Sequence, residues 1–97
     1  MQAKLIELPS VYSELESDLS KNKSTYMDYI YDRLKSQYKN NKLPKKISLF
    51  KFKDTNLVII ITSEHMPQVI QNLLDYYIEI ELYENCSLLK KIINNID

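Results

Sequence analysis

Three groups of side chains in this sequence have the chemistry for acid–base or nucleophilic catalysis. His65 is the single histidine, a residue type that acts as a general base near neutral pH. Cys86 is the single cysteine, and a thiol near a helix N-terminus is a potential nucleophile. Glu79 and Glu81 are two residues apart, which on a strand places both carboxylates on one face, roughly 6–7 Å apart. Paired carboxylates at that separation can perform acid–base chemistry.

None of these groups has a partner motif. We therefore predict that His65 is a surface residue in the first turn of a helix, that Cys86 is structural, and that the two glutamates lie on a solvated strand face. A metal site needs more than one histidine or cysteine at ligand spacing. The chain has no glycine, which excludes glycine-rich phosphate loops and dinucleotide-binding motifs. The sequence predicts a protein that is not an enzyme and uses no cofactor or metal.

Charge is segregated along the chain although the formal net charge is zero. Residues 1–20 carry −3, residues 21–53 carry +8 and residues 54–97 carry −5. A lysine-rich band can contact phosphates, with a tyrosine stacking on bases. The candidate residues for contact with an anion or another partner are Arg33, Lys35, Tyr38, Lys42, Lys45, Lys46, Lys51 and Lys53.

Two features weigh against nucleic acid as the partner of this band. Arg33 is its only arginine, whereas contacts to base edges favour arginine. The zero net charge also differs from the strongly basic balance of nucleic-acid-binding domains. A solvated surface that offsets the acidic ends of the chain is the simpler explanation.

Apolar periodicity predicts the elements that position these side chains in the first half of the chain. Residues 3–8 form a short apolar segment that predicts a strand, and Pro9 ends it. Two apolar stripes at helical spacing predict helices over about 10–20 and 26–40. The second helix is expected to stop at Asn40-Asn41. Tight turns with positive φ must use Asn or Asp in a chain without glycine.

The second half begins with a predicted β-hairpin formed by residues 47–53 and 57–62. The segment 57–62 is apolar on both faces, which predicts a central strand covered on both sides. A helix over about 64–75 follows. The alternation of apolar and polar residues over 76–84 favours a half-buried edge strand. A continuous helix is the alternative, because Leu74, Ile78 and Leu82 are also four residues apart.

A final helix is predicted from Asn85 or Ser87 onward. Its apolar stripe either covers the sheet or contacts another subunit, and it consists of Leu88, Leu89, Ile92, Ile93 and Ile96. The resulting order, β-α-α-β-β-α-β-α, predicts one α+β domain over residues 1–97. The arrangement expected is a split β-α-β, or ferredoxin-like, fold with its first and third strands central. The alternative is a helical domain with one β-hairpin, resembling winged-helix-like proteins.

The eight tyrosines and the apolar terminal helix favour a non-catalytic interaction protein, acting as a subunit, adaptor or inhibitor. Its expected partner is another protein or a second copy of the chain. The alternative is a nucleic-acid-binding protein that uses residues 33–53. This alternative suits a viral or plasmid-borne protein, because the excess of Ile, Lys, Asn and Tyr is typical of AT-rich genomes.

The sequence also predicts where the protein acts. No apolar run approaches the ~20 residues that a membrane-spanning helix needs, so no membrane is expected among its partners. The first residues lack the apolar stretch of a secretory signal, and one cysteine forms no disulfide framework. These features predict an intracellular protein of the cytoplasm or nucleus.

Overall fold

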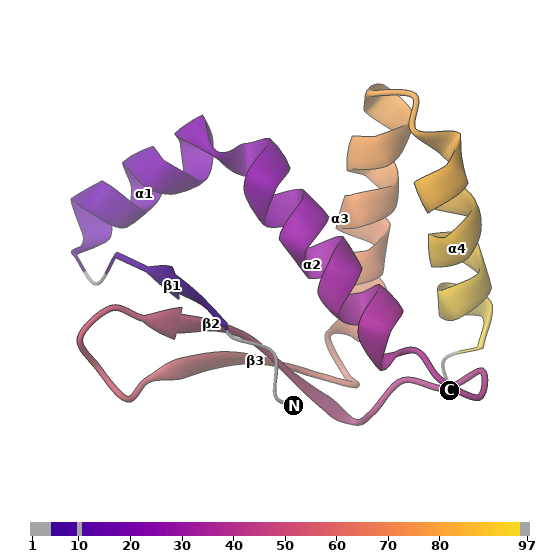
Figure 1. The fold of residues 1–97 in the computed structure, drawn as a ribbon. Coiled ribbons are helices and arrows are strands. Elements are labelled where there is room, and N and C mark those ends of the chain that lie inside the picture. Colours follow the sequence, from indigo (N-terminus) through magenta and orange to yellow (C-terminus); the bar gives the residue numbers. More distant parts are fainter. Residues whose placement is uncertain (1–4, 10, 96–97) are drawn as a thin grey trace.

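The computed structural model describes residues 5–9 and 11–95. These residues form a small α+β domain with four helices and a three-stranded mixed sheet (Figure 1). The elements in chain order are β1 (Ile6–Leu8), α1 (Tyr12–Lys21), α2 (Lys23–Gln37), β2 (Lys46–Phe52), β3 (Val58–Thr62), α3 (Met66–Glu79) and α4 (Tyr83–Asn94). The predicted α+β class and the order of the first six elements are confirmed.

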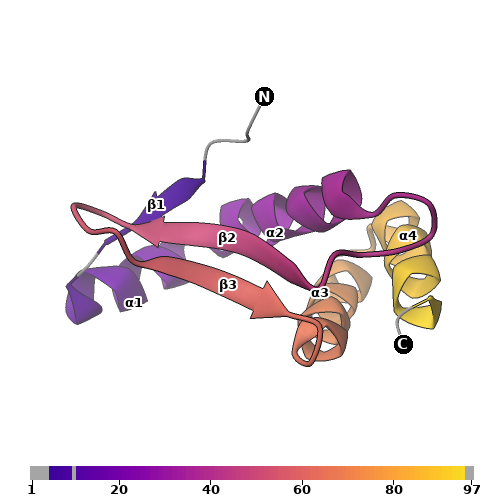
Figure 2. The same cartoon turned by 90° about the horizontal axis from the view of Figure 1, so that it is seen from below.

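The domain has two layers, with all four helices on one side of the sheet (Figures 1 and 2). The strand order is β1-β2-β3, where β1 is parallel to β2 and β2 is antiparallel to β3. A single apolar core fills the space between sheet and helices. Its largest fully buried side chains are Leu34, Ile47, Met66, Ile70, Leu73, Tyr77, Leu89 and Ile92.

The predicted ferredoxin-like arrangement is wrong in two respects. The central strand is β2, because the connection through α1 and α2 lays β1 beside β2 in parallel. The strand expected over 76–84 is not formed, since α3 continues to Glu79 and α4 begins at Tyr83. Helical spacing prevails there because Leu73, Leu74 and Tyr77 all bury their side chains on one face of α3.

The tight turns use the residues expected of a chain without glycine. Asn40 and Asn41 both have positive φ, at 55° and 61°. They form a two-residue turn closed by reciprocal 3.0 Å hydrogen bonds between the backbones of Lys39 and Lys42. Asp54 has φ 61° in the turn between β2 and β3. These positions confirm the prediction that Asn and Asp replace glycine.

The turn between α3 and α4 is the exception, because Glu81 occupies its left-handed position with φ 62°. The Leu82 N–H donates to the Tyr77 carbonyl at 2.9 Å, and the Glu81 N–H donates to the Ile78 carbonyl at 3.1 Å. These two bonds define a Schellman motif, which usually has glycine at this residue. A side chain with a Cβ is disfavoured in this conformation. The backbone at this turn is therefore strained.

Candidate functional site

The candidate catalytic side chains do not come together. His65 is exposed immediately before the first residue of α3, whereas Cys86 is buried in α4 next to the far end of α3. The length of α3, roughly 20 Å, separates these two positions. Glu79 ends α3 and Glu81 lies in the following turn, so the predicted shared strand face does not exist. These four side chains therefore form no common site.

The Arg33 side chain makes a structural contact within the domain. Its Nε and Nη2 atoms both donate to the Ser48 carbonyl, at 3.1 and 2.7 Å. The neighbouring Leu49 carbonyl accepts the Tyr29 hydroxyl at 2.6 Å. Both carbonyls belong to a β-bulge in β2, where the register with β3 shifts between Ser48 and Phe50. Two side chains of α2 thus satisfy the backbone at the bulge, and the guanidinium is committed to this contact.

Tyr38 also contributes to tertiary structure. It lies half-buried at the end of α2 and packs against the core. Its hydroxyl accepts a 2.9 Å hydrogen bond from Nδ2 of Asn95, which follows α4. This hydrogen bond joins the ends of α2 and α4, and its two residues are 57 positions apart in the sequence. Stacking of this ring on a base would require its withdrawal from that position.

The bulge determines where two of the candidate lysines lie. Lys46 pairs with Thr62 and Lys51 pairs with Val58, which are four residues apart on β3. Side chains four residues apart on a regular strand share a face. The extra residue in β2 therefore brings Lys46 and Lys51 to the same face, although their own spacing is odd. This face is the one that the helices leave uncovered (Figure 2).

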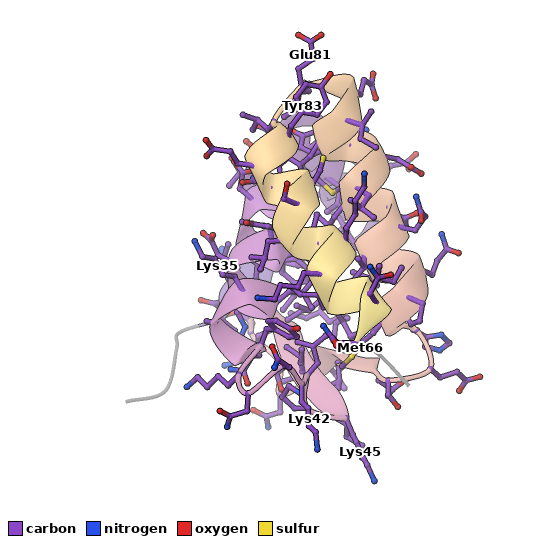
Figure 3. The ribbon with its side chains drawn as sticks, turned by 90° about the vertical axis from the view of Figure 1, so that its right-hand side faces the viewer. Lys35, Lys42, Lys45, Met66, Glu81 and Tyr83 are labelled. Atoms are coloured by element: carbon purple, nitrogen blue, oxygen red, sulfur yellow. The ribbon has the colours of Figure 1, made fainter. Side chains whose placement is uncertain are left out.

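The other lysines of the band are distributed around the domain. Lys42 and Lys45 border a hollow of about 290 Å³ whose apolar lining includes Leu43 and Met66. Lys35 lies on α2, away from Lys42 and Lys45 (Figure 3). Lys53 is exposed just after β2. The basic band thus divides among the uncovered sheet face, the end of the domain and one helix.

The apolar stripe of the last helix belongs to the core. Leu89 and Ile92 are completely buried, and Leu88 and Ile93 are partly buried against the core cluster. Between the two alternatives for this helix, the burial of these side chains favours internal packing over a subunit contact. Ile96 lies outside the described residues.

Two exposed apolar segments are the main features that the sequence patterns did not locate. The first, the β3 segment, is the run 57–60, in which Leu57, Val58, Ile59 and Ile60 are 66, 41, 37 and 47% exposed. The second, the α3–α4 tip, consists of Ile78, Ile80, Leu82 and Tyr83, which are 45–60% exposed. Both segments had visible apolar patterns. The first was assigned to a covered central strand and the second to a half-buried edge strand, and both assignments hid the exposure of these side chains.

The α3–α4 tip is acidic as well as apolar. Glu79, Glu81 and Glu84 are exposed among its four apolar side chains. Glu81 and Tyr83 lie at one end of the helical pair, and Lys42 and Lys45 lie at the other (Figure 3). The domain therefore has an acidic apolar end and a basic end.

Three tyrosines have hydroxyl groups whose ionisation the fold opposes. Burial and the hydrogen bond to Asp18 raise the pKa of Tyr26 to about 12. Burial, followed by the hydrogen bond to Asp28 at 2.7 Å, raises the pKa of Tyr77 well above its usual value. Burial and the nearby carboxylates raise the pKa of Tyr31. The hydroxyls of Tyr26 and Tyr77 connect α2 to α1 and α3, which makes their role structural.

Comparisons with known proteins found no relative: no family model, curated protein or solved structure matches the chain. Within the described residues, no group of three or more His, Cys, Asp and Glu side chains is placed to hold a metal ion. None of the helices in the described part is both long and apolar enough to cross a membrane.

Proposed function

We propose that this domain is a non-catalytic interaction protein that binds another protein through the α3–α4 tip. The observation that carries the proposal is the exposure of four large apolar side chains at one turn. Folded proteins seldom leave contiguous apolar patches in water unless they serve in binding. The glutamates around the patch support a partner whose surface is both apolar and basic.

The geometry of the tip also supports a contact role. Glu81 holds a left-handed backbone where glycine is usual, and the hydrogen bonds of the Schellman motif fix it there. Strained backbone of this kind persists where the surrounding structure imposes it, and it is common at binding sites. The tip is therefore preorganised, which lowers the entropy lost when a partner binds.

Site-specific photo-cross-linking tests this proposal. A photoreactive phenylalanine analogue replaces Tyr83, and in a control protein it replaces Val11, which is 53% exposed on another part of the surface. We expect a discrete protein adduct at position 83 in extracts of the source cell that is absent at position 11. The purified partner should then bind Leu82→Lys at least about tenfold more weakly than wild type, the loss typical of one buried contact. Equal adducts at both positions, or unchanged binding by Leu82→Lys, would contradict the proposal.

A second candidate function is nucleic-acid binding, and the shared orientation of Lys46 and Lys51 favours it. Lys45 precedes these two residues at the start of β2. We expect the substitution of Lys45, Lys46 and Lys51 by Glu to abolish salt-dependent binding to labelled DNA or RNA, measured by fluorescence anisotropy. Each phosphate contact contributes about 0.9 to the log–log salt slope on duplex DNA. The exposed Lys90 and Lys91 on α4 provide the matched reversal, which should leave binding unchanged.

A further inference from the structure

We propose that β3 pairs with β3 of a second copy of this chain, in antiparallel orientation, around a two-fold axis at Ile60. The proposal concerns a surface distinct from the α3–α4 tip. Figure 1 places β3 at the lower side of the domain and the turn between α3 and α4 at the top. The two contacts can therefore exist at the same time.

The first argument is the exposure of β3 on both faces. Val58 and Ile60 lie on the uncovered face of the sheet, in register with Lys51 and Ser48. Leu57 and Ile59 lie toward the helical side but are still 66 and 37% exposed. Four consecutive exposed apolar residues are an error in a folded chain unless they serve a contact. A partner strand would put β3 in the central position that its composition predicts.

The second argument concerns the backbone hydrogen-bonding groups on the outer edge of β3. Ser63 donates to the Lys45 carbonyl at 2.8 Å, and the Leu57 carbonyl accepts the Phe52 N–H at 3.0 Å. Because the bulge lies in β2, β3 alternates without interruption between these two bonds. The backbone groups of Val58, Ile60 and Thr62 therefore point away from β2. Among the described residues, no strand pairs with this edge.

The third argument is the chemistry of the edge, which suits a second copy. Natural edge strands avoid pairing by means of charges, proline or a bulge. The segment 57–62 contains no charged residue and no proline, and the bulge lies on the neighbouring strand. Two identical edges therefore meet without like-charge repulsion, and the chain has zero net charge. Antiparallel pairing of β3 with itself gives the symmetric contact typical of two-fold dimers.

The outward positions also define the register. Ile60 is the middle of the three residues whose backbone points outward, so pairing Ile60 with Ile60 of the second copy uses all three. Val58 then pairs with Thr62 of the second copy, and the two sheets join into one. One strand with four exposed apolar side chains provides less area than permanent dimers bury. We therefore expect reversible dimers that dissociate in the micromolar range.

Sedimentation equilibrium over about 1 to 500 µM protein tests the proposal. We expect wild type to change from 11.5 kDa monomer to twice that mass. Ile60→Lys should remain a monomer throughout. Leu19→Lys on α1 is the control, because Leu19 is an exposed apolar residue (40%) outside both proposed contacts, and it should dimerise as wild type does. Circular dichroism establishes that both variants are folded.

Three results would overturn the proposal: a wild-type monomer at every concentration, dimerisation of Ile60→Lys, or growth of wild type into larger polymers. Amide hydrogen exchange on the wild-type chain provides a measurement that needs no variant. The Ile60 and Thr62 amides should exchange more slowly at high protein concentration, and unchanged exchange would contradict pairing. A monomeric wild type whose α3–α4 tip still captures a partner would overturn the β3 contact and leave the proposed function standing.

Discussion

β2 and β3 are the two strands of one hairpin and each contains four apolar residues, yet their surroundings differ. β2 pairs with β1 on one side and β3 on the other, and Arg33 and Tyr29 satisfy its carbonyls at the bulge. Within the described part of the chain β3 pairs with β2 alone, and Ile59 and Ile60 remain exposed. The difference shows that apolar content alone does not determine the burial of a strand. The connections between elements determine which neighbouring strands and helices cover it.

The largest expected effect comes from a matched pair of isoleucines on these strands. Ile47 of β2 is 2% exposed and Ile60 of β3 is 47% exposed. We expect Ile47→Ala to lower the free energy of unfolding by about 2–5 kcal/mol, because it leaves a cavity in the core. Ile60→Ala should cost less than about 1 kcal/mol in dilute protein. Urea denaturation measures both, and equal losses would refute the difference between the strands.

A second prediction concerns how α2 supports β2. Arg33→Met keeps the aliphatic part of the side chain but leaves the Ser48 carbonyl without either guanidinium donor. We expect a loss of about 1–3 kcal/mol in the free energy of unfolding, the cost of a poorly satisfied acceptor. Lys35→Met on the same helix is the control and should change stability by less than about 0.5 kcal/mol. A similar loss in both variants would mean that the arginine contact contributes nothing specific.

A smaller effect on stability is expected at the strained turn of the α3–α4 tip. Glu81→Gly removes the Cβ from a left-handed position, so we expect it to stabilise the domain by about 0.5–1 kcal/mol. Glu79→Gly, two residues earlier in α3, should destabilise the domain by up to about 1 kcal/mol. Thermal unfolding measures both changes. Destabilisation by Glu81→Gly would show that the strain at the tip is absent.

The smallest effect is a decline in stability at alkaline pH. The pKa of Tyr26 is raised to about 12 in the folded chain, above the ordinary value of 10.0. Its neutral hydroxyl therefore contributes stability that is complete below pH 10 and is lost as the pH rises toward 12. We expect Tyr26→Phe to show a shallower decline in urea-measured stability over this range. Parallel declines for wild type and Tyr26→Phe would assign the effect to other groups.

Sequence patterns predicted local structure more accurately than they predicted which strands lie side by side. Asn40 and Asn41 form the expected turn because their conformational preference is a local property. The position of β3 was mistaken because strand order depends on the connection through α1 and α2, which apolar patterns do not encode. Over 76–84 two periodicities competed, and the burial of Tyr77 shows that the helical one prevailed.

For the candidate contact residues, too, the sequence indicated the residue types but not their contacts or exposure. Arg33 has the charge expected of an anion-binding residue, but its partner is the Ser48 carbonyl beside a bulge that no sequence pattern indicated. Lys46 and Lys51 share a face only because of the same bulge. The apolar character of Leu57 and Ile60 was evident in the sequence, whereas their exposure depended on the tertiary arrangement.

The most direct test of the β3 contact is the oxidation of Ile60→Cys. In the proposed pairing, the two copies of residue 60 face each other with Cα atoms about 5.5 Å apart, a distance that a disulfide can span. The native Cys86 is buried, and Leu19→Cys on α1 provides a control at another exposed apolar residue. We predict rapid formation of a covalent dimer by Ile60→Cys on non-reducing gels and little by Leu19→Cys. Equal cross-linking of the two variants, or none at position 60, would contradict the account.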